Sequence, residues 1–325
     1  MKNDFFNESP IVLKKFLGYL QTVKGKSPKT VEEYFLDMRT FFRYIKLKRN
    51  IVPPNTDFED IKIDDIDLSL IKTITLLDIF EYMNYLREKR GNNSAARSRK
   101  CSSLRMFFKY LTNKTQELEV NPAQELETPK IGKRLPKFLT LEQSKTLLNT
   151  INSYGGKFKE RDYCIITIFL NCGLRLSELV GINFDDIKPE GTLRVIGKGN
   201  KERIVYLNDV CKNAIENYKK VRPTDMVKDK NALFISRQNN RISVKTVQLL
   251  TSKYLKLAGL GELGYSVHKL RHTAATLMYQ YGNTDIRILK EILGHENLGT
   301  TEIYTHISNN QIKNAAESNP LNNIK

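Results

Sequence analysis

The stretch TLRVIGKGNKERIVYL, residues 192–207, differs from the rest of the chain in its pattern of apolar residues. Its two flanks are rich in β-branched residues and alternate between apolar and polar side chains, which is typical of β-strands. Between the flanks, Gly197-Lys198-Gly199-Asn200 is a turn sequence. The stretch therefore predicts a β-hairpin.

On both sides of the hairpin, apolar residues recur with the period of an α-helix. In the second half of the chain, helices are predicted at residues 140–151, 161–171, 177–182, 209–220, 243–258, 267–281, 285–293 and 300–312. The predicted fold class is mainly α with a small β-sheet (α+β).

The first half of the chain is predicted to be helical. Ser27 and Pro28 can cap and start a helix whose apolar residues continue to Ile45. Thr75 and Asp78 resemble a capping box at the start of another helix, and residues 94–111 carry a further apolar stripe. Residues 50–74 are acidic and show only a weak pattern, so we expect a loop with a short ordered piece, an insertion whose role stays open.

The two halves are separated by NPAQELETPKIGKRLPKFLT, residues 121–140, which holds three prolines and no apolar periodicity. This composition predicts an extended linker at residues 117–137, between a helical domain at 1–116 and a second domain at 138–325.

The charge balance points to a polyanionic partner. The 325 residues include 53 Lys and Arg against 36 Asp and Glu, a net charge of +17, of which +8 falls before residue 117 and +9 after residue 116. Nucleic acid and anionic membranes fit such a balance. No apolar run approaches the length of a membrane span and the N-terminus does not resemble a secretory signal, so we expect a cytoplasmic protein. The four scattered cysteines predict neither a zinc knuckle nor a disulfide framework.

All four histidines, His268, His272, His295 and His306, lie in the last 58 residues. The first two have the i, i+4 spacing of metal ligands on a helix. However, Lys269 and Arg271 stand between them without a carboxylate, and two cations oppose the binding of a dication. The pattern favours an anion site over a metal site.

Arginines are the residues that suit such an anion best, because a guanidinium matches the geometry of phosphate oxygens. Arg175 follows a glycine turn and directly precedes a predicted helix, where backbone N–H groups also favour anions. Glu178 either orients Arg175 or lies exposed on that helix. Arg271 is the second candidate.

Four stretches together resemble the tyrosine recombinases, specifically their Xer-type branch. They read CGLRLSELVGI (172–182), VIGKGNKERIVYL (195–207), HKLRHTAATLM (268–278) and ILGHENLGTTEIYTHI (292–307). The resemblance is strong over residues 120–308 and looser before them, where the family has a helical DNA-clamping domain. Each residue type alone is ordinarily a surface or packing residue, and only the order and separation of the stretches favour an active site.

The resemblance implies a role for six residues. Tyr304 matches the nucleophile that forms a 3′-phosphotyrosyl bond, and Lys198 matches the general acid that protonates the departing 5′-oxygen. Arg175 and Arg271 match the phosphate clamp. His268 matches the residue that takes or relays the tyrosine proton, and His295 matches the one that hydrogen-bonds a phosphate oxygen. Strand exchange by this chemistry implies no metal, no ATP and no cofactor.

Candidate DNA contacts outside this group come from basic residues. From Arg90 to Gln116 the chain holds seven basic residues and no acidic one. Such a run is usually a solvated face, but the overall charge favours contacts to DNA phosphates. The candidates are Arg97, Arg99, Lys100 and Arg105 in the first half and Lys201, Arg203, Arg241 and Lys245 in the second.

The implied partner is double-stranded DNA with short inverted recognition arms, bound by a homo- or hetero-tetramer. Whether a second recombinase or a DNA-translocase activator takes part stays open, and the tail after Tyr304 either couples neighbouring subunits or is a frayed polar end. Two roles compete: Xer-type resolution of chromosome or plasmid dimers, and an integrase or excisionase of a mobile element. A non-catalytic DNA-binding protein and a metal-dependent hydrolase are the alternatives from other classes.

Overall fold

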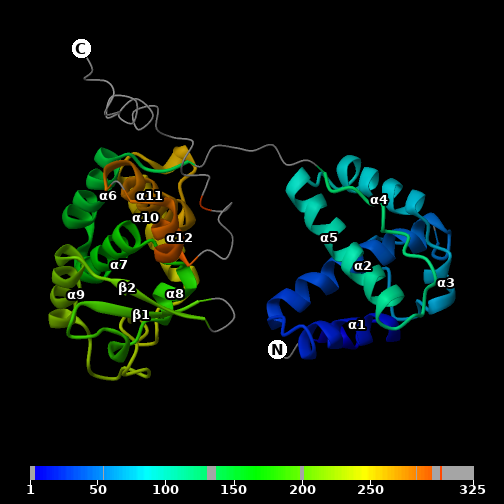
Figure 1. Cartoon of the computed structure of the whole chain (residues 1–325), viewed down its shortest axis with the longest axis horizontal. Coiled ribbons are helices and arrows are strands. Elements are labelled where there is room, and N and C mark those ends of the chain that lie inside the picture. Colours follow the sequence, from blue (N-terminus) through cyan, green and yellow to red (C-terminus); the bar gives the residue numbers. More distant parts are fainter. Residues whose placement is uncertain are drawn as a thin grey trace, which may run out of the picture. The chain divides into compact units, whose positions relative to one another are not determined.

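The computed structural model describes residues 4–53, 55–129, 137–197, 201–282, 284–294 and 301. The chain divides into two compact units, Met1–Lys133 and Arg134–Lys325, each of which has its own core (Figure 1). The described part is mainly helical with one small sheet, so the predicted fold class is confirmed. Within these residues, no helix combines the length and the apolar character needed to cross a membrane.

The first unit is built from helices. They are η1 (Asp4–Phe6), α1 (Ile11–Thr22), α2 (Pro28–Lys48), α3 (Leu68–Lys72), α4 (Leu76–Glu88) and α5 (Ser94–Asn113). The Ser27 hydroxyl caps α2 by accepting a hydrogen bond from the Thr30 amide, and Thr75 and Asp78 form the predicted capping box of α4. Aromatic rings fill the space between α1, α2 and α5, as where Phe107 meets both Phe16 and Phe42 edge to face.

The acidic segment at residues 50–74 is a loop, as predicted, and α3 is its ordered piece. The loop is tied to basic side chains of α2. Arg43 donates to the Glu59 carboxylate, and Lys46 Nζ lies 2.7 Å from Asp65 Oδ2. The acidic residues of the insertion therefore pair with the basic residues of the helix beside it.

Part of the segment expected to be a linker packs onto the first unit. Leu118, Ala123 and Leu126 are buried in its core, and the Arg105 guanidinium donates to Thr128 Oγ1 at 2.7 Å. These apolar residues are spaced too irregularly to show a period, although they pack as core residues.

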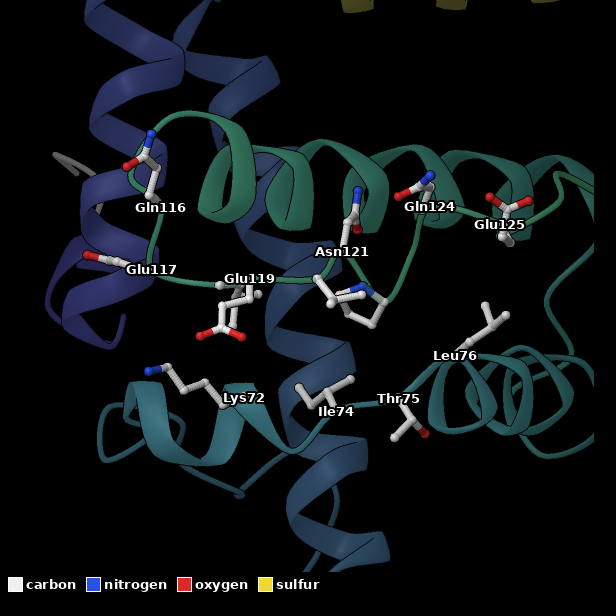
Figure 2. Close-up of a pocket in the computed structure, with 13 residues that line it drawn as sticks. Lys72, Ile74, Thr75, Leu76, Gln116, Glu117, Glu119, Asn121, Gln124 and Glu125 are labelled. Carbon is white, nitrogen blue, oxygen red and sulfur yellow. The ribbon is translucent and has the colours of Figure 1, made fainter.

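A pocket of about 850 Å³ opens in the first unit between the α3–α4 corner and the segment after α5. Lys72 and Thr75 line one side, and Glu119 and Gln124 line the other (Figure 2). None of the candidate active-site or DNA-contact residues is among its described lining residues. The six predicted active-site residues all belong to the second unit.

The second unit surrounds the buried helix α7 (Lys159–Cys172), which contacts α6 (Leu141–Tyr154), α9 (Asp209–Val221) and α11 (Val267–Tyr281). Its other helices are α8 (Leu176–Gly181), α10 (Val244–Leu257), α12 (Ile286–Leu293), η2 (Gly156–Phe158), η3 (Phe184–Asp186) and η5 (Gly261–Leu263). The predicted helix at 300–312 lies outside the described residues except for position 301. All four cysteines are buried and free.

The predicted hairpin is present as two antiparallel strands, β1 (Thr192–Ile196) and β2 (Glu202–Tyr206). Leu193 pairs with Val205 on the face that packs against the core, and Val195 pairs with Arg203. This register places an arginine among apolar residues on the inner face of the hairpin.

Candidate active site

The carboxylate of Glu178 is the centre of the candidate site, and its side chain is completely buried. Glu178 lies in the first turn of α8, where Oε2 accepts a hydrogen bond from the Arg175 amide at 2.7 Å. Oε1 accepts a second bond from Arg175 Nη1 at 2.8 Å. Of the two readings of Glu178, the structure supports the one in which it orients Arg175.

Two further guanidinium groups approach the same carboxylate. Arg203, on β2, donates from Nη1 to Oε1 at 2.7 Å and from Nη2 to Oε2 at 2.8 Å. Arg271, on α11, places Nη1 3.9 Å from Oε2. Burial alone would raise the pKa of Glu178, but hydrogen bonds from Arg203 and Arg175 outweigh burial and lower the pKa to about 2. The carboxylate is therefore charged at any physiological pH.

The same three arginines hold the C-terminal end of α12. The last carbonyls of a helix have no partner within the helix, so they need donors from elsewhere. The pairs here are Arg203 Nε with Ile292 O at 3.1 Å, Arg271 Nη2 with Leu293 O at 2.6 Å, and Arg175 Nη2 with Gly294 O at 2.6 Å. Gly294 has a left-handed φ of 64°, which glycine adopts without strain.

Arg271 also ties the end of α7 to this cluster. Its Nη1 donates to Gly173 O at 2.7 Å, and Gly173 ends α7 with a φ of 59°. The site thus joins the end of α7, the start of α8, strand β2, the first turns of α11 and the end of α12. We name the group Arg175, Glu178, Arg203 and Arg271 the arginine cluster.

Three of the six predicted active-site residues, Lys198, His295 and Tyr304, lie outside the described residues. Two of them directly follow described residues of the site. His295 comes after Gly294, and Lys198 comes after Gly197, where a Cβ would lie 3.4 Å from Glu178 Oε1. At both Gly197 and Gly294, the described residues thus end beside the arginine cluster.

The two histidines of α11 differ in their surroundings. His268, the second residue of the helix, is exposed, whereas His272 is partly buried. Burial, with the positive charges of Lys269 and Arg271, lowers the pKa of His272 to about 4. Its imidazole is neutral at physiological pH. Among the described residues, no group of three or more His, Cys, Asp and Glu side chains is placed to hold a metal ion.

Lowering the pH from 7 to 5 is expected to destabilise the chain through His272. Its folded-state pKa is depressed, so the unfolded chain binds this proton first, and stability is lost as pH falls from about 6.5 towards about 4. Because the imidazole is partly exposed and solvent screens part of the effect, we expect this residue to contribute a loss of about 1 kcal/mol over that pH step. Thermal and urea unfolding at both pH values measure it.

The matched pair of variants for this measurement is His272→Gln and His268→Gln. The first should flatten the dependence of unfolding free energy on pH, whereas the second should keep most of it, because His268 is exposed. Equal slopes for wild type and His272→Gln would contradict the prediction.

The four candidate DNA contacts of the first unit are engaged in internal interactions. Asp37 is buried and accepts from Arg99 at 2.6 Å and from the buried Lys100 at 2.9 Å. Arg97 donates to Asn92 O, and Arg105 donates to Thr128 and to Leu126 O. Arg99 retains 46% exposure of its side chain, so it is the one of the four best placed to meet a phosphate as well.

Of the four candidate DNA contacts in the second unit, two are exposed and two are bonded to other protein groups. Lys201 and Lys245 are exposed. Arg241 donates to Asp229 and Asn183, and Arg203 belongs to the arginine cluster. Only the inward register of residue 203, on the same face as Val205, could have indicated from sequence that Arg203 belongs to the site.

Comparison with known proteins identifies the family. Residues 137–311 match the model of the phage integrase family. The chain is 54% identical to tyrosine recombinase XerC of Caldanaerobacter subterraneus subsp. tengcongensis, over 96% of this chain and 87% of the relative. It is 33% identical to tyrosine recombinase XerC of Thermodesulfovibrio yellowstonii, over 90% of each.

Two solved structures share the fold. XerH recombinase bound to palindromic difH substrate, in a post-cleavage complex, gives a TM-score of 0.71 at 22% identity, covering 94% of this chain and 84% of that one. The Tn1549 transposon integrase in complex with circular intermediate DNA gives 0.68 at 18%, covering 96% and 100%. From the family model and the XerC relatives we conclude that the chain belongs to the phage integrase family and is an Xer-type tyrosine recombinase, an enzyme of site-specific DNA breakage and rejoining.

Proposed function

We propose that the chain cleaves one strand of its recombination site with Tyr304 while Arg175 and Arg271 hold the scissile phosphate. The observation that carries this proposal is the convergence of both guanidinium groups on the end of α12. The chain continues from that point through His295 to Tyr304. A phosphate bound at the two arginines would thus lie beside Gly294, from which the chain continues towards the nucleophile.

The proposed step conserves the energy of the phosphodiester bond, because a phosphotyrosyl bond replaces the bond that breaks. The Tyr304 oxygen attacks phosphorus, the bond to the 5′-oxygen breaks, and the 3′-phosphate becomes attached to the tyrosine. His268 takes or relays the phenol proton, and Lys198 gives a proton to the departing 5′-oxygen. A 5′-hydroxyl from the second duplex then attacks the phosphotyrosine, joins the strands and releases Tyr304.

Arg175 has N–H groups for this task. A guanidinium carries five N–H groups, and the hydrogen bonds of Arg175 to Glu178 and to Gly294 O use one on each terminal nitrogen. The side chain of Arg175 is 32% exposed and that of Arg271 is 9% exposed. We assign to Arg175 the more open side of the phosphate and to Arg271 the inner side. His295, next to Gly294, would complete the set of donors.

We further propose that the first unit, residues 1–116 with the segment that packs on it, is the DNA-clamping domain and that the second is the catalytic domain. The substrate would be double-stranded DNA with short inverted arms, contacted through exposed basic residues such as Arg99, Lys201 and Lys245. A homo- or hetero-tetramer would assemble on two duplexes, with a second recombinase or a DNA translocase as a further partner. A solved neighbour of the same fold is a lambda integrase tetramer bound to a Holliday junction.

For the biological role we propose resolution of chromosome or plasmid dimers in the cytoplasm. Support comes from the relative named XerC, which aligns with 96% of this chain. Mobile-element integration is the alternative. The presence of all six motif residues favours an enzyme over a non-catalytic DNA-binding protein.

Covalent capture tests the function without knowledge of the target sequence. The chain is mixed with a pool of nicked duplexes with randomised arms, with EDTA present, and denatured; we expect DNA that stays covalently bound through its 3′-phosphate. Sequencing the captured strands should yield two inverted arms. Binding to DNA without any captured strand, or capture that EDTA abolishes, would contradict the proposal.

A further inference from the structure

We infer that Arg203 is a positioning residue of the cleavage step, acting through Glu178 on Arg175 and Arg271, the two arginines that hold the phosphate. This inference rests on the proposed function. Sequence suggested Arg203 as a DNA contact, but the side chain is only 13% exposed and three of its nitrogens donate to protein acceptors. These contacts place Arg203 inside the arginine cluster, where it acts on other protein groups.

The hydrogen-bond geometry of Arg203 requires a guanidinium. Its two terminal nitrogens meet both oxygens of Glu178 in a side-by-side pair at 2.7 and 2.8 Å, while Nε donates to Ile292 O at 3.1 Å. A lysine ammonium is a point charge and does not reproduce three donors fixed in one plane. The residue thus links strand β2, helix α8 and the end of α12 through one rigid group.

The charge balance explains why Glu178 needs this partner. Three guanidinium groups and one carboxylate leave the arginine cluster with a net charge of +2, which matches the two negative charges of a pentacoordinate phosphate. Without Arg203 the net charge falls to +1. The buried carboxylate would then draw Arg175 and Arg271 towards itself and away from the phosphate.

Gly294 leaves room for the side chain of Arg203. A Cβ at Gly294 would lie 3.2 Å from Arg203 Cδ and 3.3 Å from Nε, closer than ordinary contacts. Glycine at this position therefore provides both the left-handed backbone and the space for the guanidinium. The side chain of Arg203 thus packs closely against the C-terminal end of α12.

Arg203→Lys tests the inference, with Arg194→Lys as its matched control. Arg194 lies on the same hairpin but its side chain is 44% exposed and pairs with Asp186 outside the cluster. In single-turnover cleavage of captured site DNA, we expect Arg203→Lys to be slower by about 100-fold and Arg194→Lys to stay within about twofold of wild type. DNA affinity should be unchanged for both.

Two modified substrates separate a positioning role from a merely structural one. A 5′-bridging sulfur leaves without a proton, so the defect of Arg203→Lys should persist on it, whereas a Lys198→Ala defect should largely disappear. A methylphosphonate at the scissile position lacks one negative charge, so the defect of Arg203→Gln, which removes one positive charge from the arginine cluster, should shrink at least about tenfold. On the 5′-sulfur substrate the defect of Arg203→Gln should persist, as that of Arg203→Lys does.

The outcomes that overturn the inference are distinct from failure of the proposed function. Cleavage by Arg203→Lys at the wild-type rate, recovery of its rate on the 5′-sulfur substrate, an unchanged defect of Arg203→Gln on the methylphosphonate, or a loss of DNA affinity equal to the loss of cleavage would each refute it. If wild type itself forms no adduct on any duplex, the proposed function has failed instead.

Discussion

Tyr304→Phe is expected to abolish the covalent DNA adduct while DNA affinity stays within about twofold of wild type. The substitution removes only the phenolic oxygen, which is the atom proposed to bond to phosphorus, and leaves no other oxygen on that side chain. Denaturing gels of nicked site DNA measure the adduct, and gel shifts under native conditions measure binding. Mass spectrometry of the wild-type adduct should place the nucleotide on Tyr304.

Tyr206→Phe is the control for this prediction. Tyr206 lies on the outer face of β2 and is 82% exposed, so losing its hydroxyl should leave the adduct at the wild-type level. An adduct that persists in Tyr304→Phe would mean that another residue is the nucleophile. Loss of DNA binding in that variant would mean that the tyrosine has a structural role.

Elements whose signals are local could be predicted from sequence. Ser27 and Pro28 start α2, and Thr75 and Asp78 cap α4, because the residues of a helix cap lie within one turn of each other. The hairpin was likewise predictable from the alternation on both sides of its turn. The contact of Glu178 with Arg175, three residues apart, was one of two readings that sequence left open.

Pairings between distant parts of the chain could not be predicted in this way. Lys100 belongs to a basic run whose sequence suggests an exposed face, but it is buried because Asp37, 63 residues earlier, offers a carboxylate. Arg203 reaches Glu178 across 25 residues and Ile292 across 89. A charged side chain that finds a buried partner through tertiary structure has no periodic signature in the sequence.

Arg271→Ala should reduce cleavage by about 1000-fold and destabilise the second unit by about 3 kcal/mol. The side chain is 9% exposed, and its removal leaves the carbonyls of Gly173 and Leu293 without these donors while Glu178 loses a nearby positive charge. Single-turnover cleavage and urea unfolding measure the two losses.

Arg222→Ala separates the chemical loss from the structural one. Arg222 also donates to backbone carbonyls, those of Leu233 and Ala232, but it lies outside the arginine cluster. We expect Arg222→Ala to lower the free energy of unfolding. At a temperature at which both variants are folded, it should not show the 1000-fold loss of cleavage expected for Arg271→Ala. On a methylphosphonate substrate, Arg271→Ala should regain much of its rate, because a neutral linkage needs less positive charge to reach the transition state. An equal defect of Arg271→Ala on both substrates would mean that Arg271 serves only to hold the ends of α7 and α12 together. Arg175 would then be the residue that holds the phosphate.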